Sequence, residues 1–154
     1  MLYLGISVWP HPFDGEAAGQ TADGFDFNGV MIKESIKIAP FPTQENPEFY
    51  GVILRITINN EKGKHAPYTI DVEVSGQFEI VSDKIEKEKQ EEFVIVNGCA
   101  VLYSAIRDQV MAISSRFQNG ALVLPTVNFL DKINKKTEQP EIKKSTRKRT
   151  VKES

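Results

Sequence analysis

Few side chains in this 154-residue chain are of the types that catalyse reactions or hold a metal ion. The two histidines, His11 and His65, lie in separate predicted loops, and their spacing is not that of metal ligands. The single cysteine, Cys99, lies near the start of a predicted helix, where a thiol pKa can fall, but no histidine neighbours it. A buried structural thiol is the commoner state of a free cysteine. Because no glycine-rich phosphate loop is found either, we predict neither an enzyme nor a cofactor.

The segment from Val101 to Phe129 indicates binding instead. Its first part has apolar residues at helical spacing, which predicts one helix with a single apolar stripe packed on a sheet. The stripe consists of Leu102, Ile106, Val110, Ile113 and Phe117. Gly98 is expected at the helix entry and Asn119-Gly120 at its exit, where glycine suits a left-handed cap. The extended run that follows is almost wholly apolar up to Phe129, and we expect it to lie across the molecule.

Alternating apolar residues predict the strands of an antiparallel sheet. The two clearest strands cover residues 52–58 and 68–74, the second continuing to Ile80, and residues 27–38 and 2–9 supply two more. Their sequential order and short turns favour a meander. The charge cluster at residues 84–92 is typical of a solvated helical face or a linker. These patterns together predict an α+β domain.

Composition limits the cellular setting and divides the chain in two. One cysteine cannot form an internal disulfide, and the residues after Met1 lack the basic start of a signal peptide. No apolar run reaches the roughly 20 residues of a membrane span. We therefore expect a cytoplasmic protein. Residues 1–131 hold 10 basic and 18 acidic side chains, whereas residues 132–154 hold 9 basic and 3 acidic ones. This asymmetry indicates an appended basic tail.

Four segments resemble the SecB family of bacterial export chaperones. Asn97 to Asp108 (NGCAVLYSAIRD) resembles the long-helix signature of that family, and Leu124 to Phe129 (LPTVNF) resembles its closing P-x-N-F motif. Tyr50 to Ile58 (YGVILRITI) is similar to the central strand, and Gly76 to Ile80 (GQFEI) to the end of the last strand. The four occur in the family's order and spacing over about residues 49 to 130.

This resemblance implies a four-stranded antiparallel sheet with a long helix packed on it, and four subunits arranged as a dimer of dimers. The implied domain covers residues 1–130, with residues 131–154 as a basic tail predicted to be disordered. The implied function is that of an ATP-independent holdase that keeps preproteins unfolded and passes them to the SecA motor. A groove of apolar side chains suits that task, because burial is non-directional and tolerates many client sequences.

The resemblance also implies roles for particular residues. Those expected to line the client groove are Tyr103, Ile106, Phe78, Leu122 and Leu124, with core packing as the alternative for each. The strand residues Ile70, Val72 and Val74 resemble the edge through which SecB subunits associate, although they could equally form the inner face of the sheet. Asp71 and Glu73 match an acidic site for SecA, where solvation or protection of a strand edge is the alternative.

Departures from the family leave other functions open. Ser104 and Ala105 stand where the family has a proline and an aromatic residue, the first 45 residues match poorly, and the tail is basic rather than acidic. A dedicated chaperone of one partner, such as an antitoxin, is therefore an alternative to a general export chaperone. A second alternative is nucleic-acid binding through Lys143 to Arg149. The competing interpretation of this cluster is a solvated tail that binds nothing.

Overall fold

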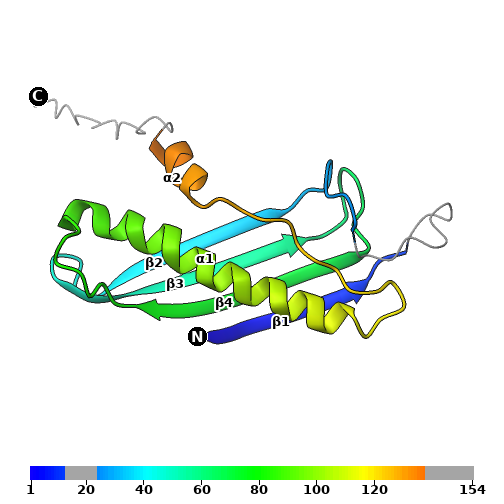
Figure 1. Ribbon diagram of the computed structural model, residues 1–154, viewed down its shortest axis with the longest axis horizontal. Helices are drawn as coiled ribbons and strands as arrows, with labels where there is room; N and C mark the ends of the chain where they lie inside the picture. Colours follow the sequence, from blue (N-terminus) through cyan, green and yellow to red (C-terminus); the bar gives the residue numbers. More distant parts are fainter. Residues whose placement is uncertain (13–23, 138–154) are drawn as a thin grey trace, which may run out of the picture.

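The computed structural model describes residues 1–12 and 24–137, which form one antiparallel sheet with a long helix across one face (Figure 1). The strands are β1 (Leu2–Pro10), β2 (Lys33–Pro42), β3 (Pro47–Ile58) and β4 (Tyr68–Phe78). The helices are α1 (Lys87–Ser114) and α2 (Leu130–Thr137). The predicted α+β class, with four antiparallel strands and one long packed helix, is confirmed.

The order of the strands in the sheet is β1-β4-β3-β2, so the predicted meander is wrong for the first strand. β2, β3 and β4 follow one another as expected, but β1 pairs with β4, with Leu2 opposite Ser75 and Pro10 opposite Tyr68. The connection from Pro10 to Lys33 is long enough to carry the chain from one edge of the sheet to the other. A short turn would have required β1 and β2 to be neighbours, but a connection of this length does not.

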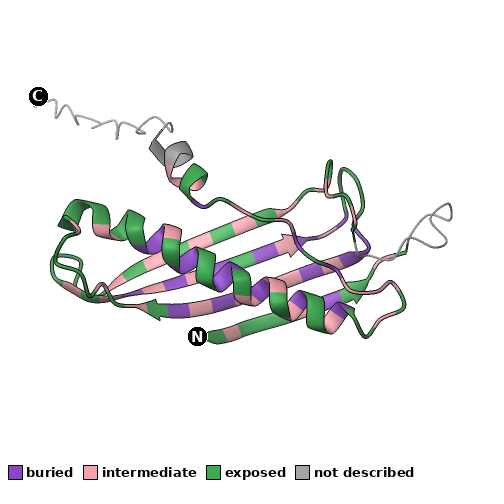
Figure 2. Ribbon diagram, viewed as in Figure 1, coloured by how far each residue is buried: buried purple, intermediate pink, exposed green. Residues whose placement is uncertain are grey.

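The core lies between the sheet and α1, and the buried residues form purple bands along the helix and the strands behind it (Figure 2). Alternate residues of the two central strands point into it, because successive side chains of a strand face opposite sides. Those that are fully buried are Val52, Leu54, Ile56, Ile58, Tyr68, Ile70, Val72 and Val74. The predicted opposite face of β3, with Arg55, Thr57 and Asn59, points away from the helix.

Helix α1 begins eleven residues before the predicted entry at Gly98, because the charge cluster forms its first turns. Gly98 lies inside the helix, where a Cβ atom would stand 3.0 Å from the ring of Phe78. The same ring, with Leu102, would stand 3.0 Å from a Cβ at Gly76. Both glycines therefore serve close packing of the helix on the sheet. The helix ends at Ser114, and Gly120 adopts the left-handed conformation (φ +83°) in the turn beyond it.

The C-terminal part of the described chain returns over the sheet and ends in α2, near β2 (Figure 1). Helix α2 occupies the first residues of the segment that the sequence predicted to be a disordered tail. Lys132 of α2 forms an ion pair of 2.8 Å with the mostly buried Glu34 of β2, and Ile133 packs against the core. The start of the predicted basic tail is thus fastened to the sheet, while residues 138–154 lie outside the described part of the chain.

Filling the space at Gly76 tests the close approach of helix and sheet. We expect Gly76→Val to lower the free energy of unfolding by about 1–3 kcal/mol, because overpacking forces Phe78 or Leu102 out of place. Gly5→Val is the matched control, since Gly5 is also a strand residue and a Cβ there meets nothing within 4 Å. Urea denaturation measures both, and equal stability of the two variants would contradict the packing described.

Candidate functional site

The predicted apolar run after α1 forms an extended segment, residues 119–128, which we call the strap (Figure 1). Its first half is fastened to the end of the helix. The single O–H of Tyr68 is shared between the carbonyl oxygens of Gly120 (2.6 Å) and Ser114 (3.0 Å). The backbone N–H of Leu122 donates to the Ser114 hydroxyl at 2.8 Å.

The second half of the strap is fastened to the middle of α1. The Tyr103 hydroxyl donates to the Pro125 carbonyl at 2.6 Å, and the Arg107 Nε–H donates to the Leu124 carbonyl at 3.0 Å. Burial raises the pKa of Tyr103 to about 12, so its hydroxyl keeps the donated proton at neutral pH. Side chains of the helix therefore hold an extended backbone through its carbonyl groups.

Of the residues predicted to line a client groove, Tyr103 and Ile106 lie on α1, Phe78 lies at the end of β4, and Leu122 and Leu124 belong to the strap itself. Ile106, Leu122 and Leu124 are fully buried, and Tyr103 is 4% exposed. Phe78 is half-buried between the two glycines at the end of β4. In this conformation the strap lies against the middle of α1, so a client can reach the buried Tyr103 and Ile106 only if the strap moves.

The three residues expected at a subunit edge occupy a different place. Ile70, Val72 and Val74 lie on the inner face of β4, a central strand, and are fully buried under α1. The inner-face alternative from the sequence is therefore the correct one. The exposed edge next to β4 belongs to β1, where Leu4 is 53% exposed, beside a register shift of the pairing with β4.

The two acidic residues predicted to meet a motor protein lie on the outer face of β4. Arg55 of β3 binds the Asp71 carboxylate through two hydrogen bonds of 2.8 and 2.7 Å. These hydrogen bonds hold the pKa of Asp71 below its ordinary value, against the opposing effect of burial. The charge of Asp71 is thus already paired within the sheet.

The structure also places the single cysteine and the two histidines, the side chains that were considered for catalysis. Cys99 is buried, and burial, together with the charge of Glu34, raises its pKa to about 12. Such a thiol is protonated at neutral pH, which fits the structural role preferred from the sequence. The histidines were wrongly placed in unrelated loops, since the Nε2 atom of His11 lies 3.0 Å from Nδ1 of His65.

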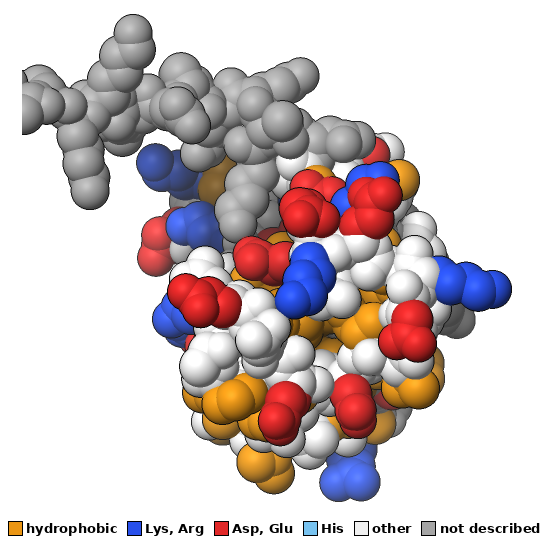
Figure 3. Space-filling view, turned by 90° about the vertical axis from the view of Figure 1, so that its left-hand side faces the viewer, with side chains coloured by type: hydrophobic (Ala, Val, Ile, Leu, Met, Phe, Trp, Pro, Cys, Tyr) orange, Lys and Arg blue, Asp and Glu red, His pale blue; other side chains and the backbone are white. Residues whose placement is uncertain are grey.

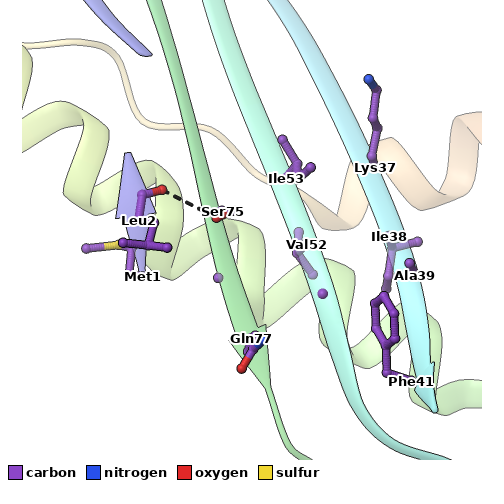
Figure 4. A pocket seen from close by; sticks show the side chains of 12 residues that line it. Met1, Leu2, Lys37, Ile38, Ala39, Phe41, Val52, Ile53, Ser75 and Gln77 are labelled. Atoms are coloured by element: carbon purple, nitrogen blue, oxygen red, sulfur yellow. Dashed lines mark hydrogen bonds between the residues drawn. The ribbon is translucent and has the colours of Figure 1, made fainter. Parts of the chain in front are cut away.

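The outer face of the sheet carries a feature that the sequence analysis missed, an open hollow of about 800 Å³. Small residues of three strands form its floor, namely Ala39, Gly51 and Ser75. Met1 and Leu2 stand on the β1 side and Phe41 on the β2 side, as Figure 4 shows. The alternation of β2 and β3 contained this signal, because Ala39, Phe41, Gly51 and Ile53 follow one another on the face away from the core.

Aromatic and aliphatic side chains remain accessible around this hollow. Phe41 stacks on Phe49 with ring centroids 5.4 Å apart and is still 46% exposed, while Leu2 is 70% exposed. At one end of the molecule, hydrophobic side chains also lie open among acidic and basic ones (Figure 3). An exposed apolar concavity of this kind can bind another apolar chain without any chemical reaction.

Two features of the chain bear on the remaining predictions. The basic cluster Lys143 to Arg149, on which nucleic-acid binding depends, lies outside the described residues. Within the described residues, no helix is both long and apolar enough to cross a membrane.

Comparison with known proteins places the chain. It is 28% identical over 86 residues to an uncharacterized protein of Methanocaldococcus jannaschii, a match that covers 55% of this chain and 54% of that protein. The chain thus spans about half the length of that curated relative. A solved structure of the Mycobacterium tuberculosis SecB-like chaperone Rv1957, in complex with a ChAD peptide from the HigA1 antitoxin, aligns with a TM-score of 0.49 at 18% identity, over 82% of this chain and 86% of that one. Residues 32–140, more than two thirds of the sequence, match the family of the preprotein translocase subunit SecB, and the chain therefore belongs to the SecB family.

Proposed function

We propose that this chain is an ATP-independent holdase chaperone that binds unfolded or extended polypeptides and keeps them from aggregating. Membership of the SecB family supports the chaperone class. The observation that carries the proposal is the open apolar hollow on the outer face of the sheet, bounded by Leu2 and Phe41. No phosphate-binding loop was found in the sequence, and the proposed binding of clients requires no nucleotide.

The hollow suits an extended polypeptide rather than a compact ligand. It spans all four strands, from Met1 at the β1 edge to Phe41 on β2. Its floor of small residues leaves room for the side chains of a client, and its aromatic and aliphatic rim supplies apolar area to bury. Because hydrophobic burial has no fixed direction, such a surface accepts many client sequences with modest affinity.

The residues beneath the strap form a second surface within the same proposal. Tyr103 and Ile106 of α1, with Phe78 of β4, line a client groove when the strap is displaced, and the client then takes the place of Leu122 and Leu124. Four of the five are buried in the closed state, so this groove adds to the outer hollow only after a conformational step.

Assembly of several copies would raise the affinity of weak individual sites through avidity. We propose the homotetramer expected of the family, a dimer of dimers, with β1 as one contact in place of the buried β4 residues. β1 is an edge strand with apolar side chains, and an edge of this kind pairs readily with a second strand. Pairing along β1 extends the sheet and leaves the outer hollow open.

The range of clients separates the two uses that the sequence suggested. A general export chaperone binds many unrelated unfolded preproteins, whereas a dedicated chaperone binds one partner, such as an antitoxin, far more tightly than the rest. A panel of unfolded clients distinguishes the two uses. Transfer to a SecA-type motor would use Glu73 more than Asp71, because Arg55 already pairs with the Asp71 carboxylate.

Charge placed at the rim of the hollow tests the proposed function. We expect the wild-type protein to suppress aggregation of a slowly folding client without ATP, and Phe41→Glu to raise the concentration needed by about fivefold. This corresponds to about 1 kcal/mol for one partly exposed aromatic contact. Light scattering during client refolding measures both effects.

Two further variants, a control and a second change at the rim, complete this test. Val81→Glu is the matched control, because Val81 is 89% exposed and does not line the hollow, so its activity should match the wild type. Leu2→Glu, on the opposite rim, should repeat the loss if Phe41→Glu is unstable. Full holdase activity in both rim variants would exclude the hollow as the client site.

Loosening the strap tests the second surface. Arg107→Met keeps the length of the side chain but removes the hydrogen bond to Leu124, which we expect to increase the open population and tighten client binding about fivefold. Arg116→Met, an exposed arginine beyond the helix end, is the control. Fluorescence titration with an unfolded client measures the change. Unchanged binding would show that the residues beneath the strap serve only core packing.

A charge on the free edge tests the proposed assembly. We expect Leu4→Lys to shift the wild-type tetramer toward smaller species, because a lysine at an edge strand opposes pairing with another strand. Val123→Lys, a similarly exposed position on the strap, should leave the assembly intact. Native mass spectrometry reads the result, and a monomeric wild-type protein would overturn the assembly altogether.

A further inference from the structure

The two histidines of the chain meet at one end of the sheet, although they are 54 residues apart in sequence. His11 follows the last residue of β1, and His65 lies in the connection between β3 and β4. The Nε2 atom of His11 and the Nδ1 atom of His65 are 3.0 Å apart, and the rings stand edge to face, with centroids 4.8 Å apart. Neither ring belongs to the hollow or the strap.

Hydrogen bonds to the backbone hold the segments that carry the two histidines. The N–H of His11 donates to the Pro67 carbonyl at 2.9 Å, and the Asn119 side chain donates to the carbonyls of Pro67 (2.9 Å) and His11 (3.3 Å). The loop that carries His65 is shaped by Asn60, which accepts a hydrogen bond from the Ala66 N–H at 2.8 Å. The pair is therefore prearranged by the backbone and not by the ring contact alone.

The two ring nitrogens are at hydrogen-bond distance, and the same separation is that of two ligands on one metal ion. Nitrogens that are each about 2.0–2.1 Å from a common ion, at an angle near 90°, lie about 2.9–3.0 Å apart. A right angle is the preference of square-planar Cu²⁺ and Ni²⁺, whereas a tetrahedral Zn²⁺ site needs the nitrogens a few tenths of an ångström further apart. Each neutral ring carries its one proton on either nitrogen, so both facing nitrogens can offer a lone pair at once.

We propose that His11 and His65 form a two-histidine site for a divalent transition-metal ion, with Cu²⁺ preferred over Ni²⁺ and Zn²⁺. The described residues contain no group of three or more histidine, cysteine or carboxylate side chains placed to hold an ion, so water completes the coordination. His65 is exposed and His11 partly so, which leaves these positions open to exchange. The bound ion joins the end of β1 to the β3–β4 connection.

This metal site is independent of the holdase function. Because the chain has only two histidines, substitution of both removes every imidazole. Untagged full-length protein is titrated with CuCl₂, NiCl₂ and ZnCl₂ at neutral pH by isothermal calorimetry. We expect one Cu²⁺ per chain, bound more tightly than the other ions. His11→Ala or His65→Ala should weaken Cu²⁺ binding at least about tenfold, because the second imidazole binds intramolecularly.

Two further measurements separate coordination from a general effect on folding. Electron paramagnetic resonance of the Cu²⁺ protein should show two nitrogen ligands, and substoichiometric Ni²⁺ should broaden the ring resonances of both histidines in the wild-type chain. Cu²⁺ should also raise the thermal midpoint of the wild type but not of His11→Ala/His65→Ala. Unchanged Cu²⁺ binding in that double variant, or no histidine nitrogen in the spectrum, would overturn the proposal.

Discussion

A sheet has two faces, and this chain has one long helix to cover them. Four strands spaced about 4.8 Å apart are about 14 Å wide between their outer axes, whereas a helix with its side chains is about 10 Å across. The helix alone is therefore too narrow even for the inner face. The strap supplies the missing cover, and Leu122, Leu124 and Phe129 complete the core beside the helix. The outer face receives no such layer, which is why apolar residues stay open there.

The fit between helix and inner face depends on which residues lack side chains. Gly76 and Gly98 leave room for the ring of Phe78, and without that room the helix would stand further from the sheet. On the outer face, a Cβ at Gly51 would stand 3.5 Å from the ring of Phe41, and the small residues Gly51 and Ala39 line the hollow beside this ring. Small residues thus close the packing on one face of the sheet and open a hollow on the other.

The periodicity of the sequence predicted the elements far better than their neighbours. Alternation identified both central strands, and helical spacing identified the stripe that includes Leu102 and Ile106, because burial imposes those periods directly. Periodicity says nothing about lateral order, so it could not decide whether Ile70 lies at a subunit edge, as the family resemblance implied, or on the inner face of the central strand β4. The meeting of His11 and His65 follows from the pairing of Pro10 with Tyr68, a register that no local pattern encodes. The glycine at 98 was taken for a helix entry because a close tertiary contact looks, in sequence, like a helix end.

Under the proposed holdase function, the strap supplies a way to release a bound client. It is an extended apolar segment fastened through its carbonyl groups, by Tyr68, Tyr103 and Arg107. A client strand presents the same carbonyl groups and similar apolar side chains, so exchanging one for the other costs little net hydrogen bonding. The Tyr103 hydroxyl, whose pKa burial raises to about 12, serves either occupant as a neutral donor. Near-equal exchange makes each contact weak and reversible, and reversible contact is what a holdase without an energy source requires.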